Sequence, residues 1–497
     1  MWTNQTAVGN MMRDVARFEG RLLRADSTLK WLLVIFVAVV VYALAHGFGE
    51  RAGQHASVEN LRADQNARWL GYKAQAKTRE IERAQAGEPR GEYTWGPRSP
   101  YTVGMWYGTQ VAAEPPPLSA LAIGQRDLYP TAHKVVAGKS LALGSLDALE
   151  NPLALAAGHF DLTFVLLYLL PFLVLALSFD LSASERETGM LRMLLAQPVS
   201  LSTLVAGKVL ARGALVAILV VAASLVGFLV AGDFDPNFDP LGDVVGRFAL
   251  WLAAALLYAA FWFALAVVVN ALNRSAAANA VVLATVWLVF VVLVPTLVNL
   301  AASSLYPVPS RQAFVAEMRV ESESAQKMNI DEDALATFIA DHPEFAENIE
   351  GGADWAMARV IRDEIASRQL APVVERYTAQ RNRQQALIKR LSYLSPTLLT
   401  HRVLLDVAGT GTTQQQAHLE RVRAFQRAWQ AHFVPLLLAK KPFRPADYDD
   451  VPRFERFDEP VSAIAWRSTG ALLGLFVIGL LLAIAGARLY GKYEVAR

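Results

Sequence analysis

The chain has 497 residues and no cysteine, with 47 lysines and arginines against 45 aspartates and glutamates for a formal charge of +2. Hydrophobic residues make up 54% of it and charged residues only 19%, whereas soluble domains average roughly 45–50% and about 25%. This composition argues against an ordinary cytosolic enzyme, and the balanced charge argues against a nucleic-acid-binding protein. The lack of cysteine excludes disulfides, thiolate metal sites and thiol nucleophiles.

Residues 1–30 predict an amphipathic helix that lies on a membrane surface, because apolar and basic side chains recur at helical spacing on different faces. One face holds Met11, Val15, Phe18, Leu22 and Ala25, and another holds Arg13, Arg17, Arg21 and Arg24.

Six stretches lack charged residues over lengths that suit a membrane span, since a hydrocarbon core of about 30 Å takes roughly 20 apolar helical residues to cross. We therefore expect a mainly α-helical membrane protein with six transmembrane helices. The predicted spans are residues 31–49, 162–180, 209–232, 247–272, 276–305 and 467–488. Pro171 in the second span and Pro295 in the fifth are candidate bend points, although simple packing kinks are an alternative.

Lysines and arginines gather next to three of the predicted connections: residues 1–30, residues 181–208 and the tail at 489–497. Because basic residues accumulate on the cytoplasmic side of a membrane, this pattern predicts that both termini are cytoplasmic. A competing interpretation makes the first span a cleaved signal peptide ending near Ala43-Leu44-Ala45, but about 30 polar residues precede it, far more than a signal peptide carries.

Two large segments then lie outside, residues 50–160 and 306–465. In the first, residues 57–87 are rich in helix formers and predict a helix that continues outward, followed by a loop-rich or small β region. The second is expected to be mostly helical, with Pro372 as a break or kink in a long helix, and with Pro396 and Gly409 framing a shorter one.

Charge is unevenly distributed within the second outer segment. Between Ala313 and Glu364 there are thirteen acidic and four basic residues, and between Ile365 and Arg444 there are thirteen basic and three acidic residues. Either the two halves pack on each other and neutralise the field, or they recognise a charged partner or substrate.

Two candidate motifs do not match the patterns that phosphate-binding and calcium-binding loops require. Gly138-Lys139-Ser140 resembles the end of a phosphate-binding loop, but His133 stands where the fingerprint requires glycine. The acidic turn at residues 233–244 has a phenylalanine and a valine where a calcium loop requires glycine and glutamate. We therefore expect neither an enzyme nor a metal site.

Apart from charged residues at or near their ends, the predicted spans hold no Asp, Glu, Lys, Arg or His except His46, near the outer end of the first. Ion-driven transporters keep such residues inside the bilayer as relays, so a protein that moves cargo without them must draw its energy from another polypeptide. This directs attention to the cytoplasmic loop at 181–208. Ser184 with Glu187, or Ser182 with Glu185, forms a candidate capping box for a short helix that ends at Pro198.

That loop resembles the type-2 family of ATP-binding-cassette (ABC) permeases. The resemblance is carried by Glu185-Arg186-Glu187-Thr188-Gly189-Met190-Leu191, followed by Gln197-Pro198 and Gly207-Lys208. A second set of residues is similar to the subfamily with two large extracytoplasmic domains and no assigned substrate. These residues are Leu394–Leu399, Asp406–Gly411 and Gly124–Leu128.

The resemblance implies a permease subunit in the bacterial inner membrane, with its outer domains in the periplasm. A second permease chain, identical or different, would pair with it among the membrane lipids, and separate cytoplasmic ATPase subunits would hold ATP and magnesium, so that this chain binds no cofactor. By the same resemblance residues 1–30 would be a connecting helix, acting through Arg13, Arg17, Phe18, Arg21 and Leu22. The coupling helix would act through Glu185, Arg186, Glu187, Gly189, Leu191, Arg192, Gln197 and Pro198.

Three functions remain open at this point. The resemblance favours an exporter. The alternative is mechanotransmission, in which ATP binding inside moves the outer helices without transport, and a continuous helix from the first span into residues 57–87 would favour it. A membrane-anchored outer enzyme is the third, and it lacks any recognisable site.

Overall fold

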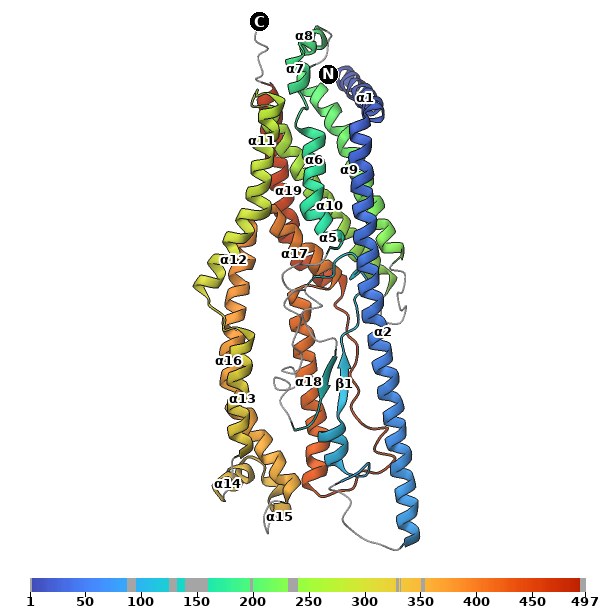
Figure 1. Cartoon of the computed structure of the whole chain (residues 1–497), viewed down its shortest axis with the longest axis vertical. Helices are drawn as coiled ribbons and strands as arrows, with labels where there is room; N and C mark the ends of the chain where they lie inside the picture. Colours follow the sequence, from blue (N-terminus) through green and yellow to red (C-terminus); the bar gives the residue numbers. More distant parts are fainter. Residues whose placement is uncertain are drawn as a thin grey trace.

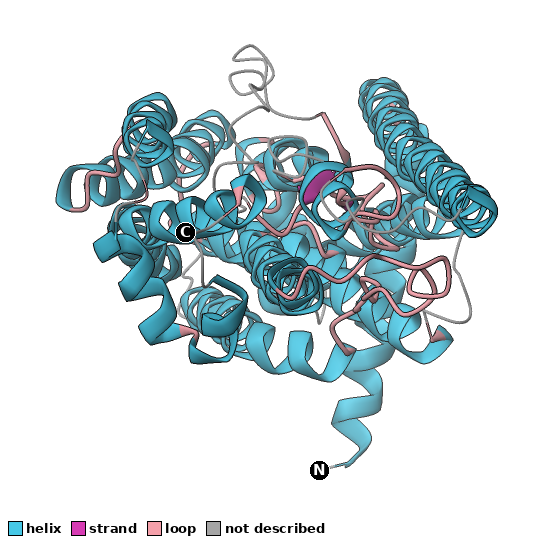
Figure 2. Cartoon of the chain, turned by 90° about the horizontal axis from the view of Figure 1, so that it is seen from below, coloured by secondary structure: helices cyan, strands magenta, loops and turns pink. Residues whose placement is uncertain are grey.

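The computed structural model describes residues 2–86, 95–124, 132–138, 160–196, 200–230, 240–327, 330, 332–349 and 354–491. This part of the chain is mainly helical and forms an elongated column (Figure 1). Viewed along the column, the strands are a small patch among helices (Figure 2). Among the described residues, six helices are long and apolar enough to cross a membrane, as predicted. They are Ser27–Gln85, Leu162–Glu187, Leu201–Val230, Leu241–Asn270, Ala276–Leu305 and Val461–Gly491.

The first span and the first outer helix are one element. Helix α1 (Trp2–Ala25) is followed by α2 (Ser27–Ala86), which starts where the Asp26 carboxylate accepts hydrogen bonds from the amides of Thr28 and Leu29, at 2.8 and 3.2 Å. The sequence predicted a span at 31–49 and a helix at 57–87 that continues outward from it, and the structure confirms this continuity, since no proline interrupts the residues between them. At 1.5 Å per residue, the 60 residues of α2 extend over about 90 Å.

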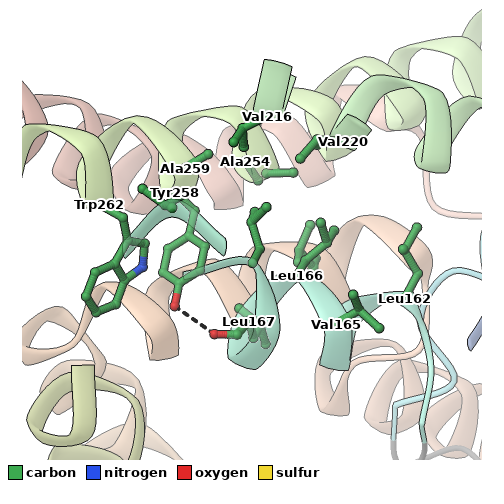
Figure 3. Close-up of a cluster of buried hydrophobic side chains, with 14 of the residues drawn as sticks. Leu162, Val165, Leu166, Leu167, Val216, Val220, Ala254, Tyr258, Ala259 and Trp262 are labelled. Atoms are coloured by element: carbon green, nitrogen blue, oxygen red, sulfur yellow. Dashed lines mark hydrogen bonds between the residues drawn. The ribbon is translucent and has the colours of Figure 1, made fainter. Parts of the chain in front are cut away.

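Helix α10 (Leu241–Asn270) lies at the centre of the membrane-spanning part, packed mainly against α19 (Val461–Gly491). Its Trp262 and Tyr258 are fully buried. The Tyr258 hydroxyl donates a hydrogen bond of 2.9 Å to the Leu167 carbonyl, and apolar side chains from neighbouring helices surround it (Figure 3). Because the tyrosine hydroxyl has a partner, burying this large ring costs little.

Both spans with an internal proline contain a π-helical segment directly before it. Proline lacks an amide hydrogen and collides with the carbonyl four residues earlier, so a wider turn relieves the clash. Pro171 and Pro295 therefore mark real irregularities, as the sequence suggested. The second span consists of α5 (Leu162–Phe164), Val165–Leu169 (π) and α6 (Leu170–Ser178), and the fifth of α11 (Ala276–Trp287), Leu288–Leu293 (π) and α12 (Val294–Leu305).

The first outer segment contains a small β region, as predicted. Strands β1 (Thr109–Ala112) and β2 (Ala132–Val135) pair antiparallel, with Thr109 opposite Val135, and a π-helical turn at Tyr101–Tyr107 precedes them. They pack against a cluster of buried rings that includes Trp429.

The second outer segment is helical, as expected. Pro372 does not break its longest helix, which continues through it. Pro396 and Gly409 frame α17 as predicted, with Ser395 as the N-terminal cap and Gly409 in the left-handed conformation at φ 79°. The helices are α13 (Arg311–Lys327), α14 (Glu332–Asp341), α15 (Ala346–Ile349), α16 (Trp355–Leu391), α17 (Pro396–Ala408) and α18 (Thr412–Leu438), with short 3₁₀ turns at Pro343–Phe345 and Ser392–Leu394.

The acidic and basic halves of this segment contact each other. Arg376 on α16 lies 3.0 Å from Glu317 on α13, and Arg368 lies 2.6 Å from Asp341 on α14. These ion pairs favour mutual neutralisation over recognition of a charged partner.

Candidate coupling site

Two short helices project from the end of the molecule that also carries α1 and the end of α19 (Figure 1). They are α7 (Ala183–Glu187) and α8 (Met190–Leu195), separated by Gly189 in the left-handed conformation at φ 75°. Glycine adopts this conformation without the steric cost that a side chain brings. The sequence predicted one helix through this region, and that prediction is wrong because the chain turns at Gly189.

The predicted capping box is also absent. Ser182 precedes α7 but makes no side-chain capping bond. Its hydroxyl lies 3.0 Å from that of Tyr490 on α19. The carboxylate of Glu187, which the capping box would have turned back onto α7, contacts α11 instead. The start of α7 is thus held by another helix rather than by its own sequence.

Glu185 binds the third span. Lys208 on α9 (Leu201–Val230) is 4% exposed, and its ammonium group donates to the Leu181 carbonyl at 2.9 Å and to the Glu185 carboxylate. A buried lysine needs such partners to offset the loss of water around its charge.

The next two residues bind the fourth and fifth spans. The Arg186 guanidinium donates to the side-chain oxygen of Asn273 and to the Arg274 carbonyl, in the turn between α10 and α11. The Glu187 carboxylate accepts a 2.8 Å hydrogen bond from the Ala276 amide at the first turn of α11. An anion is stabilised there by the unpaired amides and the dipole of the helix. Three successive charged residues therefore tie α7 to three parts of the membrane-spanning bundle.

Helix α8 has a buried side and an exposed side. Leu191 is 2% exposed and packs with Leu204 and Tyr490, whereas Met190 and Met193 are 52% and 73% exposed. Gly189 and Arg192 are also exposed, and Gln197 and Pro198 lie outside the described residues. Exposed methionines adapt well to a partner surface.

Helix α1 packs along α9 and keeps its predicted amphipathic character. The side chains of Arg13, Arg17 and Arg21 are exposed. Phe18 and Leu22 are 61% and 51% exposed, as expected of side chains that face lipid.

A buried ion pair that the sequence analysis missed attaches α1 to the bundle. Glu19 is 4% exposed, and its carboxylate lies 2.7 Å from Nε and 2.6 Å from Nη2 of Arg212 on α9. Arg212 also contacts the Asp180 carboxylate at 2.6 Å and the Leu177 carbonyl. The signal that was available is the position of Glu19, an acidic residue at helical spacing from Val15 and Leu22 on the apolar face.

A family model described as ABC-2 family transporter protein matches residues 23–495. The chain belongs to this family. It is therefore a membrane-embedded permease component of an ABC transporter, and members of the ABC-2 family usually work with cytoplasmic ATPase subunits and are generally not catalytic themselves. No curated protein matches the chain in a sequence comparison. In this ABC-2 chain, the family resemblance and the tethered α7–α8 hairpin direct attention to the same end of the molecule.

Proposed function

We propose that the chain is the permease subunit of an ABC exporter in the bacterial inner membrane, and that the α7–α8 hairpin docks on a separate cytoplasmic ATPase that binds ATP and magnesium. Both termini are cytoplasmic in this proposal, the outer domains are periplasmic, and two permease chains, identical or different, pair in the lipid.

One observation carries this proposal. The Glu185–Glu187 segment is fixed to α9, to the α10–α11 turn and to α11, while Met190 and Met193 point outward. The two helices of the hairpin thus have different roles: α8 offers an apolar contact surface, and α7 links that surface to the spans. A push on α8 reaches three spans through buried or backbone-bonded charges, and packed elements respond to such a push by shifting between discrete arrangements.

These separate roles of α7 and α8 change the roles that the sequence predicted for the coupling residues. Glu185, Arg186 and Glu187 transmit force within the chain, whereas the ATPase binds the exposed side of α8 together with Arg192. Arg13, Arg17 and Arg21 hold α1 against the inner lipid surface, with Phe18 and Leu22 inserted among the acyl chains.

The test is ATP hydrolysis by the complex of this chain with its ATPase, reconstituted in lipid. Met193→Glu places a charge on the exposed side of α8, and we expect it to reduce binding of the ATPase and to abolish the effect of the permease on hydrolysis. Val320→Glu is the matched control, because Val320 is a 67% exposed apolar residue on α13 at the other end of the molecule. Equal hydrolysis and equal ATPase binding in the two variants would remove the docking assignment.

A second function, mechanotransmission without transport, is favoured by the unbroken helix α2. A single rigid element that joins the membrane to the outer region can carry motion directly between them, and residues 50–56 are helical throughout.

Gly53 allows a clean test of the second function, because an added Cβ meets nothing within 4 Å there. Gly53→Pro interrupts the helix where it leaves the span, and Gly53→Ala is the control that preserves it. If mechanotransmission is correct, the proline variant loses its effect on the envelope in cells but retains normal ATP hydrolysis. An intact envelope response in the proline variant would exclude α2 as the transmitting element.

A further inference from the structure

A cavity of about 400 Å³ lies where the outer region meets the ends of the spans. Its walls come from the turn between α17 and α18, from the first turns of α10 and α19, and from the segment after β1. It is therefore at the opposite end of the spans from the α7–α8 hairpin (Figure 1). Its volume is within the range of sites for small molecules, roughly 300–1,000 Å³.

Four arginines and three carboxylates line this cavity. Each carboxylate already has an arginine partner, so that none is left to bind a cationic ligand on its own. Glu114 pairs with Arg62 and with Arg456 at 2.6 Å, Asp458 with Arg456 at 2.9 Å, and Glu459 with Arg467 at 2.6 Å.

Arg421, in contrast, is held by an aromatic ring and a backbone carbonyl. Its guanidinium lies 3.3 Å from the ring centroid of Phe457 and donates a long hydrogen bond of 3.4 Å to the Phe457 carbonyl. Within the described ranges its charge has no carboxylate within ion-pair distance. Burial lowers the pKa of Arg421, while the carboxylates of Glu459 and Asp458 act in the opposite direction.

Two polar atoms on the same wall lack hydrogen-bond partners among the described residues. Thr410 is 6% exposed and its hydroxyl is unpaired, and the side-chain carbonyl oxygen of Gln414 is buried and unpaired. A buried polar group without a partner costs about 1–3 kcal/mol, so such groups call for an explanation. Gln414 keeps its orientation because its amide donates to the Asp406 carbonyl at 2.9 Å.

Helix α18 starts on this wall without a capping side chain, because the residue in the capping position is Gly411. The positive end of the dipole of this 27-residue helix therefore lies at the cavity wall, where the Asp406 carboxylate also lies next to Gly411. The first amides of the helix, Arg421 and the Thr410 hydroxyl supply donors for an anion. The Gln414 oxygen supplies an acceptor for a hydroxyl group attached to that anion.

We propose that this cavity binds a phosphate ester that carries hydroxyl groups, with the phosphate on Arg421 and the start of α18. The ligand chemistry is that of a glycerol phosphate group, either free in solution or as the headgroup of a phospholipid that reaches the cavity from the adjoining membrane surface. The site is independent of the ATPase, so that binding is measurable on the permease alone.

The first experiment measures binding of sn-glycerol 3-phosphate to the purified full-length chain by calorimetry. Arg421→Ala removes the charge that the site depends on, and we expect the affinity to fall on the order of tenfold, as a charged hydrogen bond implies. Arg423→Ala is the matched control, since Arg423 is exposed on the same helix outside the cavity, and it should bind like the unchanged chain.

Native mass spectrometry in phosphatidylglycerol vesicles distinguishes the two sources. Retention of the lipid by the unchanged chain and by Arg423→Ala, but not by Arg421→Ala, assigns the site to a headgroup. Binding of the soluble ester without retained lipid assigns it to a free phosphate ester.

If Arg421→Ala does not fold, Thr410→Val tests the proposed site, because it removes one hydrogen-bond donor while keeping the shape of the side chain. A severalfold weaker affinity in this variant supports the site. The proposal is overturned if the unchanged chain binds neither probe, or if the cavity variants bind as tightly as Arg423→Ala.

Discussion

The two ends of this molecule use charge in different ways. At the end with the α7–α8 hairpin, charged side chains are buried and join helices that are distant in sequence, as Glu19 and Arg212 join α1 to α9. At the other end, α13 is joined to α16 by an exposed ion pair, Glu317 with Arg376, whose side chains are 48% and 68% exposed. Buried pairs fix a geometry at high cost if one partner is lost, whereas exposed pairs contribute little.

Loss of Arg212 should have the largest effect on stability. Arg212→Ala leaves Glu19 buried without its counterion, which costs about 3–5 kcal/mol in comparable cases. Thermal or chemical unfolding of the purified chain in detergent measures this loss of stability. Arg17→Ala, on the exposed face of α1, should stay within roughly 0.5 kcal/mol of the unchanged chain. The double change Arg212→Ala with Glu19→Gln should recover part of the loss, and no recovery would mean that the pair is not the cause.

Loss of the Glu187 carboxylate should have an intermediate effect. Glu187→Ala removes the anion at the start of α11, which is worth about 1 kcal/mol at a helix N-terminus. Glu187→Gln keeps an acceptor for the Ala276 amide and should lose only part of this stability. Because the carboxylate links α7 to α11, we also expect Glu187→Ala to weaken the effect of the permease on ATP hydrolysis. Full coupling in this variant would show that Glu185 and Arg186 suffice.

The number of spans and most outer helices could be predicted because they depend on local properties, namely charge-free length, prolines and caps. Pro396 and Gly409 frame α17 as expected for this reason. A short helical element between the second and third spans could be predicted from the sequence, but its geometry could not. Gly189 turns the chain, and Glu187 finds a partner 89 residues away. A contact of that kind follows from how helices pack, and no local pattern contains it. For the same reason, the sequence alone did not predict the Glu19–Arg212 pair.

Acid should affect the outer region through His133, whose side chain is 5% exposed on β2. Burial lowers the pKa of His133 below its usual 6.5. Below about pH 6.5 the unfolded chain therefore binds a proton that the folded chain excludes, and stability falls as the pH drops. The slope from one such group is at most about 1.4 kcal/mol per pH unit. The shift of the unfolding midpoint between pH 7.5 and 5.5 should be smaller in His133→Gln than in His55→Gln, which alters a partly exposed histidine on α2 that lies 3.8 Å from Glu59. Equal shifts would mean that His133 does not carry the pH dependence.

The smallest effect is expected at the exposed pair between α13 and α16. Arg376→Ala removes the 3.0 Å contact with Glu317, but both side chains are largely in water and recover their hydration when separated. The loss should therefore be below about 1 kcal/mol and should shrink further when salt is raised from 0.05 to about 0.5 M, because added ions already screen the pair. Unfolding of Arg376→Ala and of the unchanged chain at the two salt concentrations measures both quantities. A loss as large as that of Arg212→Ala would show that buried and exposed ion pairs contribute equally to stability at the two ends. It would also show that α13 is held to α16 by this ion pair rather than by the apolar contacts of Met318 with Leu370 and Val373.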